Sequence, residues 1–170
     1  QAVQKLDEVL KSLDLENKSD YEKCKSIMWW IRNHVKYDWH YYGESDKPAS
    51  TRYPHDLTGA VLDGYAVCDG FAGVFYYMAN AAGIQALYED GTDDGEGHAW
   101  NLVQIDGIYY YIDPTDVRLN FTDDGELDSE ILWGSNNIYK KTRVPYTDII
   151  EKTYKNISQD DYSKEHSICK

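Results

Sequence analysis

The sequence predicts an α+β fold in which three helices are followed by an antiparallel sheet. Apolar residues recur at helical spacing up to about residue 82, and after Gly83 they recur as short strand-like runs. Helices followed by strands favour an antiparallel sheet over repeated βαβ units. The 170 residues, 42% hydrophobic and 28% charged, fit a single domain. We expect a domain over residues 1–170, with a core at about 20–140, a lead-in helix at 1–18 and a polar end at 154–170.

Two helices are predicted before the central part of the chain. The first covers residues 2–15, with one apolar stripe, and the second follows Ser19. Glu22, three residues after Ser19, completes the pattern of a capping box. The helical spacing places Cys24 and His34 on the side of the second helix that faces the core.

A third helix is predicted over residues 68–82, and it begins at Cys68 directly after a glycine-bearing loop. The partial positive charge at a helix N-terminus favours the thiolate, which is the nucleophilic form of cysteine. Gly70 and Gly73 lie inside this helix, where each costs on the order of 1 kcal/mol relative to alanine. Close packing against a neighbour or access for a substrate would explain them. Between the second and third helices, residues 37–53 are aromatic and irregular in pattern.

Three strands are predicted after the helices, over residues 84–89, 97–105 and 108–113. Asp106 and Gly107 separate the last two strands and form a strong signal for a two-residue hairpin. In that register Ile105 pairs with Ile108, which fixes every other pair along the hairpin.

The hairpin register brings His98 close to Asp113. Asp113 falls opposite Trp100, and because side chains alternate along a strand, His98 lies on the same face. His98 and Asp113 are then diagonal neighbours with Cα atoms about 7–8 Å apart. The same face carries Trp100 and Leu102, which predicts packing against a helix. If that helix is the one beginning at Cys68, the three polar groups converge.

Cysteine, histidine and aspartate together supply a nucleophile, a proton shuttle and a carboxylate that orients the imidazole. Three other interpretations exist: an inert core cysteine, a polar pair on a solvated sheet face, and a metal site. No two ligand residues have the short spacing typical of zinc sites. We therefore expect neither a metal nor a cofactor.

Three segments in this order resemble the motifs of the transglutaminase-like superfamily: Gly64–Ala72 (GYAVCDGFA), Gly97–Asn101 (GHAWN) and Tyr111–Thr115 (YIDPT). The stretch from Asp20 to Asp38 is similar to the lead-in helix of its bacterial members. The resemblance covers about residues 20–120.

The resemblance implies a papain-like α+β core with Cys68 as the nucleophile, His98 as general base and acid, and Asp113 as the orienting group. It implies acyl transfer from a peptide or protein amide bond through a thioester. The Cys68 backbone N–H and, as a second donor, Tyr37 would stabilise the oxyanion. Animal members of the superfamily use calcium, but the acidic segments 89–96 and 123–126 lack full EF-hand spacing, and we predict solvated turns.

Three functions fit these residues. Hydrolysis by a cysteine peptidase or amidase is favoured, because no signature of a closed, water-excluding channel is present. A protein-glutamine transglutaminase would use an amine acceptor in place of water. A non-catalytic binding module at the cell surface would keep the fold without needing all three residues.

The composition argues against nucleic acids and membranes as partners, while the resemblance implies a peptide or protein substrate. The formal charge of −13 opposes nucleic-acid binding. The longest apolar run, Phe71–Ala79, is far shorter than the ~20 residues of a membrane span. The oligomeric state stays open.

The cysteine count does not fix the compartment. A disulfide between Cys24 and Cys169 would leave Cys68 free, and the sequence leaves that pairing open. No signal peptide is visible, and the chain begins at Gln1, so an upstream export signal is possible. Acidity, the 16 tyrosines and this start favour an extracellular or cell-surface location.

Overall fold

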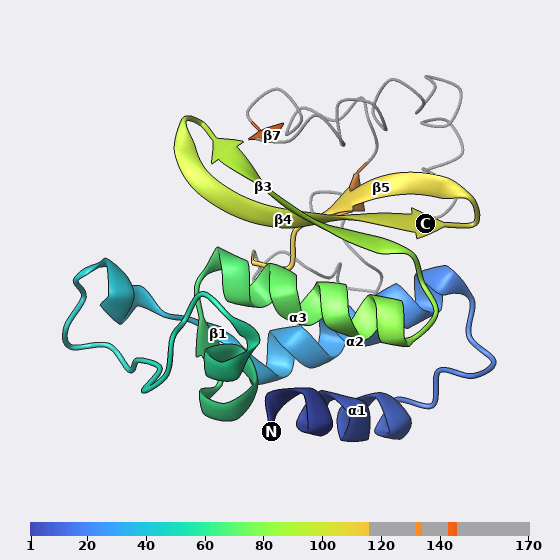
Figure 1. Cartoon of the computed structure of the whole chain (residues 1–170), viewed down its shortest axis with the longest axis horizontal. Helices are drawn as coiled ribbons and strands as arrows, with labels where there is room; N and C mark the ends of the chain where they lie inside the picture. The colour runs from blue at the N-terminus through green and yellow to red at the C-terminus, as the bar shows by residue number, and fades with distance from the viewer. Residues whose placement is uncertain (116–131, 134–142, 146–170) are drawn as a thin grey trace.

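A computed structural model of the chain describes residues 1–115, 132–133 and 143–145. It contains three α-helices on one side of an antiparallel sheet (Figure 1). The helices are α1 (Ala2–Ser12), α2 (Asp20–His34) and α3 (Cys68–Ala81). α3 contacts the sheet as well as α1 and α2, so it lies at the centre of the packing. The predicted α+β fold class is confirmed.

The sheet has five strands in the order β6-β5-β4-β3-β7, and every neighbouring pair is antiparallel. The three long strands are β3 (Ala86–Asp93), β4 (Glu96–Ile105) and β5 (Ile108–Ile112). The edge strands are the short β6 (Leu132–Trp133) and β7 (Arg143–Pro145). Within the described residues no helix combines the length and apolar character needed to cross a membrane.

A second, two-stranded sheet lies before α3. Its strands β1 (Lys36–Tyr37) and β2 (Tyr65–Ala66) pair in parallel. The chain between them forms a 3-10 turn, η1 (Trp39–Tyr42), and a short π-helical turn, η2 (Gly59–Asp63). The segment 37–53, predicted to be irregular, starts at this pairing and contains the 3-10 turn η1.

α2 begins and packs as predicted, with one exception at its end. Ser19 Oγ accepts a hydrogen bond from the Glu22 N–H, and Glu22 Oε2 accepts from the Ser19 N–H, so the capping box is present. Cys24 is fully buried. The prediction that His34 faces the core is wrong: His34 is exposed, and its ring stacks on Trp30 with centroids 4.7 Å apart.

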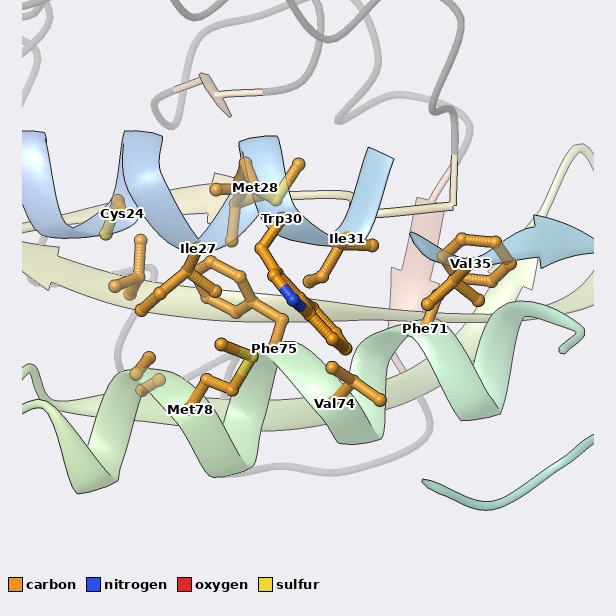
Figure 2. Close-up of a cluster of buried hydrophobic side chains, with 14 of the residues drawn as sticks. Cys24, Ile27, Met28, Trp30, Ile31, Val35, Phe71, Val74, Phe75 and Met78 are labelled. Atoms are coloured by element: carbon orange, nitrogen blue, oxygen red, sulfur yellow. The ribbon is translucent and has the colours of Figure 1, made fainter. Parts of the chain in front are cut away.

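The main core lies between α2, α3 and the sheet. Figure 2 shows the α2 and α3 side chains interleaving, and Val103, Ile105, Tyr110 and Ile112 of the sheet belong to the same buried cluster. Burying each such large apolar side chain contributes about 1.5–3 kcal/mol. α3 is therefore covered on several sides, which fixes the position of its first residue.

The β4–β5 hairpin has the predicted register. Ile105 pairs with Ile108, and Asn101 pairs with Ile112. Asp106 and Gly107 have φ of 51° and 82°, as a two-residue turn of type I′ requires.

The expectation that the face carrying Trp100 and Leu102 packs against a helix, with α3 as the candidate, is wrong. These side chains form a separate cluster with Tyr111, whereas Ala99 packs with residues of α3 and Asn101 donates to a carbonyl of α3. All residues from 99 to 103 are buried. Since both faces of β4 are covered, its apolar pattern could not indicate which face meets the helix.

The acidic segment 89–96 also differs from the prediction. Residues 89–93 continue β3, and only Asp94 and Gly95 form the turn to β4. Glu89 is only 2% exposed, so this is not a solvated acidic turn. The predictions for residues 123–126, for the polar end at 154–170 and for Cys169 lie outside the described residues.

Candidate active site

Cys68 is the first residue of α3 and lies at a buried junction of several segments. η2 ends at Gly64, which has φ of 79°, and Val67 is the extended cap residue before the helix. Cys68 is 5% exposed and packs against Ala72 and Ala99. Its sulfur thus lies at the positive end of the helix and beside the sheet.

Gly70 has the close packing that the sequence suggested, but Gly73 does not. A Cβ atom at Gly70 would lie 2.7 Å from the Pro54 carbonyl oxygen and 2.7 Å from the Ala66 Cβ. At Gly73 the nearest atom would be Leu57 Cδ2, at an ordinary 3.6 Å. The loop before η2 therefore rests directly on the first turn of α3.

His98 and Asp113 are in direct contact, as the hairpin register predicts. His98 Nε2 lies 2.7 Å from Asp113 Oδ2. The other carboxylate oxygen of Asp113 accepts from the Thr115 N–H at 2.9 Å, and Asp113 is only 2% exposed. The His98 ring is stacked on Trp100 with centroids 6.0 Å apart. The imidazole is thus fixed both at its edge and on its face.

The environment of His98 favours its protonated form. Burial opposes the charge, but the hydrogen bonds with Asp113 and Cys68, together with the negative charges of both, outweigh it and raise the pKa of His98 to about 10. Because Nε2 faces Asp113, Nδ1 is the nitrogen left for Cys68. An imidazolium in this place would stabilise a thiolate.

Cys68 and His98 line a common cleft of about 390 Å³. One wall is aromatic and consists of Tyr37, Trp39 and Tyr42, and the rim is acidic and consists of Glu44, Asp93 and Glu96. Of these six lining residues, sequence reasoning proposed a role only for Tyr37. The aromatic composition of the segment 37–53 pointed to Trp39 and Tyr42, and the acidic segment 89–96 contained Asp93 and Glu96.

Tyr37 comes to the cleft through the pairing of β1 with β2, in which it lies beside Ala66. Its ring packs against Trp39 and Phe71, with centroids 4.6 Å and 6.3 Å away. Burial, a hydrogen bond with Tyr42, and the negative charges of Cys68 and Asp113 raise the pKa of Tyr37. The phenol therefore stays protonated and can donate a hydrogen bond toward the cleft.

The residue after the nucleophile position, Asp69, is the centre of a second polar network. Its Oδ2 lies 2.6 Å from His55 Nδ1, and its Oδ1 accepts from the Tyr88 hydroxyl at 2.8 Å. The Cys68 sulfur lies 3.8 Å from the same Oδ2. Sequence reasoning missed this network, because it joins three segments whose spatial relationship no local pattern encodes.

No metal-binding cluster is found in the part of the chain that the structure describes: three or more His, Cys, Asp or Glu side chains nowhere gather there as ligands. The polar groups of the cleft are a thiol, an imidazole, carboxylates and phenols. This set is suited to nucleophilic and acid–base chemistry.

Residues 7–114 match the family described as the Transglutaminase-like superfamily. The chain belongs to this superfamily. The match includes the positions of Cys68, His98 and Asp113. It also includes α2, α3 and the three long strands up to the end of β5.

Individual transglutaminase-like relatives support this assignment. The Kyphoscoliosis peptidases of Mus musculus and Homo sapiens are each 32% identical to this chain over 122 residues, which are 65% of this chain and 18% of the relative. The chain thus spans less than a fifth of the length of these curated relatives. Among solved structures, a TGase superposes with a TM-score of 0.57 at 24% identity, covering 68% of this chain and 31% of the other.

A candidate cysteine protease from Cytophaga hutchinsonii has the same fold. It superposes with a TM-score of 0.51 at 22% identity, covering 68% of this chain and 38% of the other. The two structural likenesses show that the helices and the antiparallel sheet are arranged as in transglutaminase-like proteins.

Proposed function

We propose that this domain is a thiol-dependent acyl-transfer enzyme that hydrolyses amide bonds of peptides or proteins. The observation that carries the proposal is the common cleft of Cys68 and His98, with His98 Nε2 held 2.7 Å from Asp113. Cys68 is the nucleophile, His98 is the base and acid, and Asp113 orients the imidazole. A cysteine peptidase or amidase is the activity that these groups support best.

In the first half-reaction the Cys68 thiolate attacks the amide carbonyl carbon, and the carbonyl π electrons move to oxygen. The tetrahedral intermediate collapses, the C–N bond breaks, and the nitrogen takes a proton from His98 Nδ1. The products are a free amine and a thioester on Cys68. The raised pKa of His98 supports this step, because the imidazolium is present at neutral pH.

In the second half-reaction a water molecule attacks the thioester carbonyl carbon. The neutral His98, left after the first step, takes a proton from the water. The C–S bond breaks, the carboxylic acid leaves, and the thiolate–imidazolium pair returns. Asp113 stays ionised and keeps Nε2 protonated throughout.

Oxyanion stabilisation needs donors in place before the reaction begins. The backbone N–H of Cys68 lies in the first turn of α3, where N–H groups have no partner within the helix. Tyr37, which lines the same cleft and stays protonated, is the proposed second donor.

The acidic rim favours one further candidate, a protein-glutamine transglutaminase. Glu44, Asp93 and Glu96 would raise the local concentration of cationic amines near the thioester. An amine would then replace water as acceptor. Hydrolysis stays the first choice, because Glu44 and Glu96 are exposed and leave the rim open to water.

The test incubates the full chain with a peptide library, with and without a labelled primary amine, and analyses the products by mass spectrometry. We expect cleaved or deamidated peptides in both samples and little incorporated label. Abundant amine incorporation would establish the transglutaminase instead.

Two cysteine variants serve as controls for this test. Cys68→Ala should abolish every product, while Cys24→Ala, which removes the other described free thiol, should leave turnover in place. The absence of all products from the unmodified chain would favour a non-catalytic binding module.

A further inference from the structure

The proposed catalytic groups are divided between two parts of the fold. Cys68 begins α3, whereas His98 and Asp113 belong to the sheet hairpin and its end. The distance from the sulfur to the imidazole therefore depends on how α3 is fixed against the sheet. A thiolate gains from an imidazolium only at short range, so small shifts at this junction alter the chemistry.

Asp69 carries a direct polar link across this junction. Its carboxylate accepts a hydrogen bond from the Tyr88 hydroxyl at 2.8 Å, and Tyr88 lies on β3. β3 is the strand that pairs with β4, and Gly91 of β3 pairs with His98 itself. One hydrogen bond thus joins the residue next to the nucleophile to the strand next to the base.

His55, in the loop before α3, holds the same carboxylate from another part of the chain. Its Nδ1 lies 2.6 Å from Asp69 Oδ2. The rings of Tyr41 and Tyr53 pack on the His55 ring, with centroids 4.7 Å and 5.0 Å away. Asp69 is therefore constrained by the loop before α3 and by the sheet after it.

The Cys68 sulfur is within reach of this fixed carboxylate, at 3.8 Å from Asp69 Oδ2. Burial, the hydrogen bond to Asp69, and the negative charge of Asp69 raise the pKa of Tyr88, so its hydroxyl remains a donor at all ordinary pH values. Ionisation of Tyr88 therefore does not break the link at ordinary pH values.

We propose that Asp69 is a positioning residue, held by Tyr88 and His55, that sets the place of the Cys68 sulfur relative to His98. The inference rests on the proposed function, in which Cys68 reacts as a thiolate beside the imidazolium. Asp69 itself does not touch the reacting carbonyl group. It acts through the first turn of α3.

The test compares two tyrosine variants by the rate at which iodoacetamide modifies Cys68 across a pH series. Tyr88→Phe removes only the hydroxyl that reaches Asp69. Tyr77→Phe is the matched control, because Tyr77, on α3, donates to Asp7 at 2.6 Å and does not line the cleft. The measurement detects the thiol itself and needs no substrate.

We expect Tyr88→Phe to slow alkylation at neutral pH about fivefold, on the order of one net hydrogen bond. The limiting rate at high pH should be unchanged, and Tyr77→Phe should match the unmodified chain. Identical profiles for the two tyrosine variants would overturn the proposal.

Variants of Asp69 separate positioning from a general loss of structure. Asp69→Asn can still accept from Tyr88 and should keep most of the rate, whereas Asp69→Ala should lose at least as much as Tyr88→Phe. The double variant Asp69→Ala/Tyr88→Phe should be no slower than Asp69→Ala, since both changes break one link. The inference would be contradicted if Asp69→Asn and Asp69→Ala lowered the alkylation rate equally. It would also be contradicted if the double variant were slower than Asp69→Ala by the full factor of Tyr88→Phe.

The inference and the proposed function fail in different ways. A shifted alkylation profile without any peptide turnover would refute the peptidase while supporting the role of Asp69. Turnover by the unmodified chain, with coincident profiles for the two tyrosine variants, would do the reverse.

Discussion

His98 and Asp113 are joined at 2.7 Å across two strands that a two-residue turn connects. The contact is set by the register of the sheet hairpin, whereas Cys68 lies on α3, a separate element. This division decides which substitutions should affect orientation of the base and which should affect its distance from the sulfur.

Removing the Asp113 carboxylate should leave the base without its orienting group. We expect Asp113→Ala to lower kcat by about 10²–10⁴-fold. The pKa of His98 should fall from about 10, because a hydrogen bond and a negative charge are both lost. NMR titration of the His98 imidazole measures the fall in its pKa. Asp106→Asn, in the exposed hairpin turn, is the control and should change neither quantity.

The raised pKa of His98 predicts a pH dependence of stability. The folded state holds the proton up to about pH 10, whereas the unfolded chain releases it near 6.5. The stabilisation is therefore complete below pH 6.5 and is lost as the pH rises toward 10. Urea unfolding should show a decline of up to a few kcal/mol over this range. His98→Gln should flatten the curve, and an equal decline in that variant would refute the assignment.

Two glycines of α3, Gly70 and Gly73, should respond in opposite ways to replacement by alanine. Gly70→Ala places a Cβ 2.7 Å from the Pro54 carbonyl oxygen, so we expect a loss of about 1–3 kcal/mol in the free energy of unfolding. Gly73→Ala meets only Leu57 at 3.6 Å and should gain up to about 1 kcal/mol from helix propensity. Urea titration of both variants checks the signs. If Gly70→Ala were more stable than the unmodified chain, the loop that carries Pro54 would have moved away from the added Cβ.

The phenol of Tyr37 should matter for turnover more than for binding. Tyr37→Phe keeps the ring packed on Phe71 but removes the proposed oxyanion donor. We expect kcat to fall about 10–100-fold with little change in KM, since the donor acts on charge that develops during reaction. Steady-state kinetics on a cleaved peptide measures the two constants separately. The control is Tyr53→Phe, at a ring that is 62% exposed and does not line the cleft, and it should match the unmodified enzyme.

The two described free cysteines should differ in reactivity. Cys68 lines the cleft beside His98, while Cys24 is fully buried and burial raises the pKa of its thiol. Iodoacetamide at neutral pH should therefore modify Cys68 first, and His98→Gln should slow that reaction. Peptide mapping follows both sites. Equal rates in the native protein would argue against an activated thiol, and urea should make the rates similar.

The contact between His98 and Asp113 was predictable because it depends only on a turn and on strand alternation. Asp106 and Gly107 specify the turn, and a turn of that length leaves one register. Ser19 and Glu22 likewise predict the start of α2, because the capping box that they form is a purely local interaction. Features encoded by a few neighbouring residues can be predicted from the sequence with physical reasons.

Features that depend on packing between elements were missed or wrongly assigned. Trp100 was expected to face α3, but both faces of β4 are buried and the apolar pattern is the same for either choice. The link between Asp69 and Tyr88 depends on where α3 crosses β3, which has no local signal. Glu89 was expected in solvent because its acidic neighbours suggested a turn, yet the strand continues through it.

The short parallel pairing of β1 with β2 separates the position of Tyr37 from the identity of the other aromatic residues in the cleft. It fixes Tyr37 beside Ala66, two residues before Cys68. The intervening segment supplies Trp39, Tyr42 and Glu44 to the cleft. Exchanges confined to residues 39–44 can therefore alter the lining of the cleft, whereas Pro54 and His55, which contact the first turn of α3 from the same segment, should be left in place. The stretch 39–44 is the natural target for altering selectivity, with Cys68 and His98 left unchanged.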